Sequence, residues 1–312
     1  MSRTAYFWTP ESLLHDNGRH VENVERARRL APERILPQVA SLIHMESKPH
    51  AASEWVLRVH EEEHHRFVRE ACASGRCILD GGDTQAGPGS YEAAIASVDA
   101  ALSSADAVVG GEVDNAFCAA RPPGHHALPF QSMGFCLFAT ASILVRYLQE
   151  QHGLRKIAVV DWDVHHGNGT QDIFWQDPDV FFVSLHQHPH YPGTGLANET
   201  GEGAGEGKTL NIPVAAGTSE ESYLAKFEEN VIPAIEAHGP EAVVVSAGFD
   251  AHRDDPLGGL KITEAGFARL TGWLKKLAES LCEGRLICLL EGGYNLDALE
   301  RSVVAHLREL SA

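Results

Sequence analysis

The sequence predicts an α/β protein in which helices cover both faces of a parallel β-sheet. Short apolar runs rich in β-branched residues alternate with helical segments along the chain, which is the pattern of repeated strand–helix units. Several of these runs stop at glycine and titratable side chains, as buried strands of α/β sheets do at their carboxyl ends. Because no linker, repeat or low-complexity segment interrupts the 312 residues, we expect one domain that spans 1–312.

The expected elements follow in chain order. The strands are the apolar runs 5–8, 116–120, 157–160, 180–186, 242–249 and 286–290. The helices are expected at 21–30, 54–73, 91–103, 138–151, 219–238, 263–282 and 299–310. Ser90 is a plausible N-cap, as is Thr218 or Ser219. The long glycine-rich loop 188–208 is typical of functional loops.

The segment 54–73 is rich in charge, which favours a surface helix. On this interpretation its three histidines, His60, His64 and His65, lie on a solvated face and carry no function.

Composition limits the function. The formal net charge of −18 argues against nucleic acid as a partner, because phosphate binding needs clusters of Lys and Arg. The charge predicts a well-dispersed surface with mild attraction for cationic substrates such as lysine tails or polyamines. The six cysteines form no CxxC pair and are interpreted as small buried hydrophobes in a reducing compartment. Because the N-terminus lacks a signal-peptide core and no apolar stretch approaches ~18 residues, we expect a cytoplasmic protein without a membrane partner.

The most informative segment is Asp-Trp-Asp-Val-His-His-Gly-Asn-Gly, which directly follows the strand 157–160. Side chains alternate along an extended chain, so Asp161, Asp163 and His165 are expected to project to one side. Three other strands also end in polar groups, and these groups are Arg-Pro-Pro-Gly-His-His at 121–126, Asp250, and Glu-Gly-Gly-Tyr at 291–294. Since α/β sheets place ligands at the carboxyl ends of their strands, the four groups predict one active site.

Asp163, His165 and Asp250 are the candidate metal ligands. Three protein ligands with an open fourth position are typical of catalytic rather than structural zinc. Two carboxylates and one imidazole suit a Lewis acid that polarises a carbonyl and activates water. Because sites of this composition accept iron as well, the choice between zinc and iron in the cell stays open.

Two histidines and one tyrosine complete the expected chemistry. His125 and His126 follow Pro-Pro-Gly, which stiffens the backbone and fixes the direction of both imidazoles. Histidine titrates near neutral pH and is the natural general base and acid. Asp161 and Asn168 are the candidate partners that orient the two rings. Tyr294 follows two glycines, and its phenol could donate to a developing oxyanion.

These motifs together resemble the histone deacetylase family. The resemblance rests on Arg-Pro-Pro-Gly-His-His, Gly134-Phe135-Cys136, Asp-Trp-Asp-Val-His-His-Gly-Asn-Gly-Thr-Gln, Ser-Ala-Gly-Phe-Asp and Leu-Glu-Gly-Gly-Tyr-Asn-Leu, and it covers nearly the whole chain. The residue types at Trp162 and Asn168 resemble those of the class II branch of the family and of the bacterial deacetylase-like amidohydrolases. The resemblance implies the arginase/deacetylase fold, a three-layer α/β/α domain around an eight-stranded parallel sheet. It also implies zinc-dependent hydrolysis of an acetylated amine, in acyl-lysine or a small molecule, to the free amine and acetate.

The resemblance assigns a role to each residue of the site. The zinc ligands match those named above, and His126 is the general base and acid. His125 is an electrostatic partner that Asp161 orients, and Tyr294 polarises the acyl carbonyl. A structural potassium ion is also implied, at Asp161 and the backbone oxygens of Asp163, His165, Ser184 and Leu185.

The acyl-lysine tunnel is implied by the same resemblance. Phe135 and Tyr191 match its two aromatic walls, and Gly134, Leu257 and Asp83 are assigned to its lining. The family usually has Phe at the position of Tyr191, so a hydroxyl is added at the tunnel mouth. Leu257 stands where a polyamine-selective relative carries Glu, which favours an uncharged or protein-borne substrate end.

The early family motif His-Pro-Glu-x-Pro-x-Arg lacks both prolines in this chain. It reads His-Val-Glu-Asn-Val-Glu-Arg at 20–26, which predicts a rim loop of different shape. Arg26 still matches the arginine near the product channel.

Three other functions compete. An acetylpolyamine amidohydrolase fits the acidic charge and the loop 201–207. A binuclear manganese ureohydrolase places an Asp ligand for the second metal at the position of His252, two residues after Asp250, but the rest of its Asp-Ala-His-x-Asp pattern is absent. A non-catalytic acyl-lysine-binding module should lack a ligand, a histidine or the tyrosine, and the sequence retains them all. The oligomeric state is open, with a homodimer or homotetramer as candidates.

Overall fold

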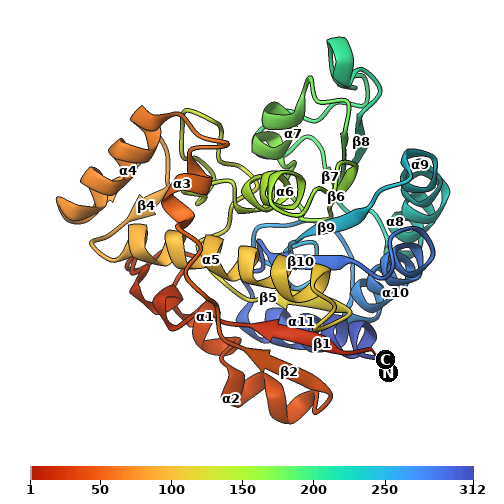
Figure 1. Ribbon diagram of the computed structural model, residues 1–312, viewed down its shortest axis with the longest axis horizontal. Helices are drawn as coiled ribbons and strands as arrows, with labels where there is room; N and C mark the ends of the chain where they lie inside the picture. Colours follow the sequence, from red (N-terminus) through yellow and green to blue (C-terminus); the bar gives the residue numbers. More distant parts are fainter. Residues whose placement is uncertain (1) are drawn as a thin grey trace.

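An eight-stranded parallel sheet lies between two layers of helices in the computed structural model, which describes residues 2–312 (Figure 1). Every neighbouring pair of strands in this sheet is parallel. In spatial order the strands are β2 (Leu42–Met45), β1 (Thr4–Phe7), β5 (Asn115–Cys118), β10 (Leu286–Leu290), β9 (Ala242–Ala247), β6 (Ile157–Asp161), β7 (Val180–Gln187) and β8 (Thr209–Val214). A separate antiparallel pair consists of β3 (Cys77–Ile78) and β4 (Gln85–Ala86). The predicted three-layer α/β/α architecture is confirmed.

Two hydrophobic cores fill the space between the sheet and its helices. One core contains residues of α3 (Ala52–Val56), α4 (Glu62–Ala73), α5 (Ser90–Val109), α6 (Thr140–Glu150) and α7 (Asn168–Phe174). The other core lies on the opposite face, and its elements are α2 (Pro32–Ile35), α8 (Glu220–Lys226), a π-helical turn η4 (Phe227–Val231), α9 (Ile232–His238), α10 (Glu264–Leu281) and α11 (Leu296–Leu310). Helix α1 (Glu25–Arg29) packs on α11. Short 3-10 turns occur at η1 (Pro10–Leu14), η2 (Leu36–Gln38) and η3 (Gly203–Gly205).

The central strands are buried at every position and consist mostly of apolar residues, because both of their faces are covered. In β6, Ala158 and Val160 enter the core with α8–α11, whereas Ile157 and Val159 enter the core with α3–α7. Burying one Val or Leu side chain contributes roughly 1.5–3 kcal/mol, so a run of such residues holds the strand firmly in the middle layer.

The four strands whose ends carry the chemical motifs are direct neighbours. They form the centre of the sheet in the order β5-β10-β9-β6. Because the strands are parallel, their carboxyl ends meet at one edge, as the sequence predicts.

Two outer strands lie outside the prediction. β2 at one edge is partly exposed and contains His44. β8 at the other edge contains Asn211 and Pro213. An edge strand packs less completely and tolerates proline, so its sequence lacks a continuous apolar run.

The prediction of one helix over 54–73 with solvated histidines is wrong. The chain forms α3 and α4 with a break between them, and His60, His64 and His65 are only 3%, 4% and 8% exposed. His60 Nδ1 donates to Leu128 O at 3.0 Å, and its Nε2 accepts from Ala139 N at 2.8 Å. The histidines therefore form the buried face of this helical region.

The cysteines of the described residues form no disulfide bonds. All six cysteines belong to the described residues and are free thiols; five are buried and Cys77 is partly exposed. Among residues 2–312, no helix is long and apolar enough to cross a bilayer.

Candidate active site

The candidate metal ligands converge at the carboxyl ends of β6 and β9. Asp163 and His165 follow β6, and Asp250 follows β9. Their ligand atoms all lie within 4.8 Å of one another, and the three residues are buried. His165 Nδ1 lies 3.0 Å from Asp163 Oδ1 and 3.1 Å from Asp250 Oδ2. One imidazole thus sits between two carboxylates, which is a donor set typical of divalent zinc or iron.

The electrostatics of these residues fit a divalent cation. Burial and the charge of Asp163 raise the pKa of Asp250 to about 7. Burial lowers the pKa of His165, but its contacts with Asp163 and Asp250 outweigh this effect and raise the pKa to about 10. The contact with Asp250 Oδ2 is not aligned as a hydrogen bond, so this buried oxygen lacks a donor. A bound cation would replace the proton on His165 Nδ1 as the positive partner of the two carboxylates.

Backbone groups fix the direction of the two carboxylates. Val164 N donates to Asp250 Oδ1 and Gly292 N donates to Asp163 Oδ2, each at 2.8 Å. A Cβ atom on Gly292 would collide with both carboxylates. Glycine is therefore required here because the backbone approaches the ligands so closely.

The two adjacent histidines have different partners on Nδ1. His125 Nδ1 lies 2.9 Å from Asp161 Oδ2, and His126 Nδ1 lies 2.7 Å from Asn168 Oδ1. Both partners are oxygen acceptors, so each Nδ1 donates its proton. Nε2 of His126 is then the basic nitrogen of a neutral ring.

The protonation of the pair follows from these surroundings. Burial alone would lower the pKa of His125, but the charges of Asp161 and Asp163 outweigh it and raise the pKa well above its ordinary value. For His126, burial and then the charges of His125 and His165 hold the pKa well below its ordinary value. A charged imidazole therefore lies beside a neutral one.

Tyr294 faces the same cavity as His126. Burial and the charge of Asp250 raise the pKa of its phenol well above the ordinary value, so the hydroxyl keeps its proton. The guanidinium carbon of Arg26 lies 5.0 Å from the ring centroid, and Tyr294 N donates to Asp255 Oδ2 at 2.7 Å. The phenol is a fixed hydrogen-bond donor.

A cavity of about 190 Å³ leads from the surface to these groups. Its walls are Asp83, His126, Gly134, Phe135, His165, His190, Tyr191, Leu257 and Tyr294. The structure thus brings together all the residues that the sequence assigned to the tunnel. Tyr191 is 41% exposed and marks the mouth, and Phe135 N donates to Thr84 Oγ1 at 3.1 Å, which ties one aromatic wall to the neighbouring loop.

The remaining predicted residues surround this cavity. Arg26 is fully buried and donates from Nε to Gly293 O at 2.7 Å, so it lies behind the tyrosine rather than in the tunnel wall. Ser184 pairs in register with Asp161 across β6 and β7, and Leu185 follows it. Asp161, Ser184 and Leu185 of the expected potassium site are therefore close in the sheet.

One wall residue, His190, and one carboxylate that binds the backbone of two wall residues, Asp255, were not identified from the sequence. His190 stacks on His165 with ring centroids 4.8 Å apart, and its Nε2 donates to Leu257 O at 2.8 Å. Asp255 accepts backbone hydrogen bonds on both of its side-chain oxygens. Leu257 N donates to its Oδ1 at 2.9 Å, and Tyr294 N donates to its Oδ2. His190 precedes Tyr191 and Asp255 lies two residues before Leu257, and this proximity is the sequence signal that could have located them.

A buried ion cluster lies beneath the site and was also missed. Glu22 is 0% exposed and contacts Arg121 Nη2 at 2.6 Å and Arg26 Nη1 at 2.9 Å. In the sequence, Glu22 and Arg121 are recognisable only as members of two family motifs. A carboxylate between two arginines shows that both motifs contribute to one polar network.

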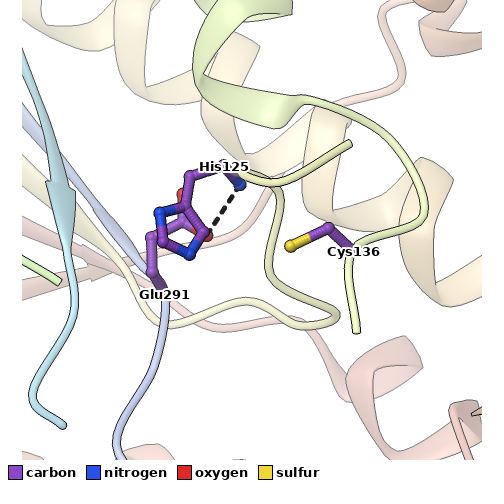
Figure 2. A group of neighbouring side chains, drawn as sticks. All are labelled: His125, Cys136 and Glu291. Carbon is purple, nitrogen blue, oxygen red and sulfur yellow. Dashed lines mark hydrogen bonds between the residues drawn. The ribbon is translucent and has the colours of Figure 1, made fainter. Parts of the chain in front are cut away.

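A second group of potential ligand atoms includes His125 itself. His125, Cys136 and Glu291 are buried and place a nitrogen, a sulfur and an oxygen within 4.8 Å of one another (Figure 2). The backbone N–H of His125 donates to Glu291 Oε2 at 3.2 Å, which is the contact drawn in Figure 2.

Comparisons with known proteins agree with this geometry. The family model of the histone deacetylase domain matches residues 20–310. A histone deacetylase-like amidohydrolase of Pseudomonas aeruginosa is 39% identical, over 99% of this chain and 86% of that protein. Among crystal structures, the HDA15 HD domain has a TM-score of 0.91 and 35% identity, over 99% of this chain and 88% of that one. An acetylpolyamine aminohydrolase from Burkholderia pseudomallei has a TM-score of 0.88 and 28% identity, over 100% and 99% of the two chains.

The fold and the comparisons define a hydrolase of the deacetylase and amidohydrolase class. This chain belongs to the histone deacetylase family. The resemblance inferred from its motifs is confirmed, and so is the fold that the resemblance implies.

Proposed function

We propose that this protein is a zinc-dependent deacetylase that hydrolyses the amide of N-acetyl-lysine, or of a related acyl-amine, to the free amine and acetate. One observation carries the proposal. A neutral His126, the phenol of Tyr294 and His165 line one cavity, and His165 belongs to the Asp163–His165–Asp250 triad. We further propose that 1–312 acts as one catalytic domain in the cytoplasm.

Asp163, His165 Nδ1 and Asp250 would hold the zinc ion. When bound, zinc supplies the Lewis acidity that polarises the acyl carbonyl and lowers the pKa of water. The buried Asp250 Oδ2, which has no hydrogen-bond donor, supports this assignment. The same ligands would accept ferrous iron. A potassium ion is proposed beside Asp161 and the backbone of Ser184.

His126 acts as general base and then as general acid. Its Nε2 takes a proton from the attacking water and returns it to the leaving amine nitrogen. The hydrogen bond from Nδ1 to Asn168 keeps the ring in the required tautomer. His125 stays protonated against Asp161, and its charge stabilises the negative charge that develops on the oxygen atoms bound to the acyl carbon.

Tyr294 donates its hydroxyl proton in a hydrogen bond to the acyl oxygen. Its high pKa supports this role, because a phenolate could not donate. The alkyl chain of the substrate would lie between Phe135 and Tyr191, with Asp83 and Leu257 nearer the entrance. We assign Arg26, behind Tyr294, to the route by which acetate leaves.

An acetylpolyamine is the second candidate substrate. The structural match to an acetylpolyamine aminohydrolase and the net charge of −18 favour it. Leu257 favours the peptide, because an apolar side chain at the wall offers no partner for a second ammonium group.

The test is a deacylation assay on zinc-loaded protein. An acetyl-lysine peptide is compared with N-acetylated polyamines, and Tyr294→Phe is the control. Peptide turnover that falls about 100-fold or more in Tyr294→Phe supports the proposal. Turnover of the polyamines alone would agree with the mechanism but identify a different substrate. If the zinc-bound protein hydrolyses neither the peptide nor the polyamines, the activity proposed for these substrates is refuted.

A further inference from the structure

Glu291 is a buried carboxyl group that the proposed mechanism does not use. It follows β10 directly and is 1% exposed. Figure 2 shows its carboxyl group beside the His125 ring, with Cys136 nearby. Burying a carboxyl group is unfavourable unless partners satisfy it, so a residue of this kind needs a physical explanation.

These three side chains are not arranged as a second metal site. His125 Nδ1 is bound to Asp161, and Cys136 Sγ donates to Gly134 O at 3.3 Å. Burial raises the pKa of the Cys136 thiol well above its ordinary value, so it stays protonated. Glu291 Oε2 accepts two backbone N–H groups. Because the donor atoms already have hydrogen-bond partners, the cluster is a satisfied polar network.

The contacts of Glu291 point instead to the turn that carries the histidine pair. Gly124 N donates to Glu291 Oε2 at 2.7 Å, and His125 N donates to the same oxygen at 3.2 Å. A Cβ atom on Gly124 would lie 2.7 Å from Thr140 N. The turn is therefore pressed against the start of α6 on one side and bound to Glu291 by its N–H groups.

The backbone around Glu291 is itself fixed to the metal-ligand region. Glu291 N donates to Ala247 O of β9 at 3.1 Å, and Glu291 O accepts from Arg26 Nη2. The next residue, Gly292, donates to Asp163 Oδ2 at 2.8 Å. One short segment thus connects the histidine turn to a candidate metal ligand.

We propose that Glu291 is a positioning residue that sets the place of His125 and His126 relative to the metal ligands through its two backbone hydrogen bonds. The inference rests on the proposed function, because it gives the histidines their catalytic role. A shift of about 1 Å at a catalytic group is enough to reduce turnover ~100-fold, so the loss of these two bonds should be measurable.

Two substitutions separate acceptor geometry from other effects. Glu291→Gln keeps an acceptor oxygen for Gly124 N and His125 N, whereas Glu291→Leu has similar size and no acceptor. Asn115→Leu is the matched control. Asn115 is 2% exposed at the opposite end of the neighbouring strand β5 and donates to Leu310 O, so its loss removes a buried polar group far from the histidines.

The experiment measures kcat and KM for the acetyl-lysine peptide on the zinc-loaded full chain. We expect Glu291→Leu to lower kcat about 100-fold with little change in KM, and Glu291→Gln and Asn115→Leu to stay within about fivefold of the wild type. If Glu291→Leu does not fold, Glu291→Met takes its place with the same expectation. Wild-type kcat in the apolar variant, or an equal loss in Glu291→Gln, overturns the inference.

A second readout does not depend on turnover. The proton on His125 Nδ1, held by Asp161, gives a downfield ¹H NMR signal that reports the position of the ring. This signal should persist in Glu291→Gln and shift or broaden in the apolar variant. If the wild type hydrolyses no acylated amine, the proposed function fails, yet identical spectra in all variants would still refute the positioning role separately.

Discussion

At the residue scale, a single atom in the partner side chain separates the roles of two neighbouring histidines. His125 faces the carboxylate of Asp161, and its pKa is raised. His126 faces the amide of Asn168, and its pKa is lowered well below the ordinary value, first by burial. A carboxylate stabilises an imidazolium and an amide does not, so the chain keeps one ring charged and the other basic.

Asn168→Asp should therefore move the pH dependence of the reaction. A carboxylate at position 168 stabilises protonated His126 and raises its pKa. As the pH falls, the ring is therefore protonated, and stops acting as a base, at a higher pH than in the wild type. The acidic limb of kcat/KM against pH should move upward in the variant, with activity recovered as pH rises. Asn198→Asp, at an exposed asparagine, is the control and should leave the limb in place. An unchanged or downward-shifted limb in Asn168→Asp would contradict the assignment of His126 as base.

The residues that the sequence could locate are those at strand ends. Asp163, His165 and Asp250 each follow a buried apolar run, so the parallel sheet itself brings them together. His190 and Asp255 differ because their partners are distant in sequence. His190 bonds Leu257 across 67 positions, and Asp255 bonds Tyr294 across 39. Contacts between loops depend on tertiary packing, and no local pattern predicts them.

At the element scale, predictability follows burial. Strands β5, β6, β9 and β10 are covered on both faces, and each contains a run of at least three apolar residues. The edge strands β2 and β8 have no such signal. In the region of α4, buried histidines stand at positions that normally hold apolar residues. His64, His65 and Val68 share one helix face, and this spacing was the overlooked sign of burial.

His60→Ala should destabilise this region by about 2–3 kcal/mol, because it leaves buried Leu128 O and Ala139 N without their partner. Burial holds the pKa of His60 at about 3, below the ordinary 6.5. The stabilisation by the neutral ring is complete above about pH 6.5 and declines as the pH falls below it. Urea unfolding at pH 7.5 and 5.0 measures both effects. The free energy of unfolding of His44→Ala, a substitution at an exposed residue, should stay within about 0.5 kcal/mol of the wild type. A loss as large as that in His60→Ala would argue against a specific buried role for His60.

At the scale of the whole molecule, the N-terminal segment is attached to the catalytic edge of the sheet by buried charge. Arg121 donates from Nη1 to Ser12 O at 2.9 Å and to His15 O at 2.7 Å, and it pairs with Glu22. Arg26 carries the connection onward to Gly293 O. The network joins η1, α1, β5 and β10, so stability and site geometry depend on the same groups.

Glu22→Gln should destabilise the protein by about 3–5 kcal/mol at pH 7, because two buried guanidinium groups lose their counter-charge. Although burial alone would raise the pKa of Glu22, Arg121 and Arg26 hold it well below its ordinary value. Its contribution is therefore present above about pH 4.3 and is lost as the pH falls through the depressed pKa.

Urea unfolding of wild type and Glu22→Gln at pH 7 and pH 3.5 tests this sign. The difference in unfolding free energy between the wild type and Glu22→Gln should shrink at the lower pH. Glu33→Gln, at an exposed glutamate, should differ little from the wild type in unfolding free energy at either pH. A difference that grows on acidification would mean that the paired carboxylate does not stabilise the fold.

Zinc reconstitution is the measurement to make first. The protein is stripped with a chelator and reloaded, and bound zinc per chain and turnover of the acylated amine are measured together. We expect turnover to vanish on stripping and to return with one zinc per chain, while Asp250→Asn neither retains the ion nor recovers activity. Turnover that survives metal removal, or full recovery in Asp250→Asn, would contradict the assignment of Asp163, His165 and Asp250 as the catalytic metal site.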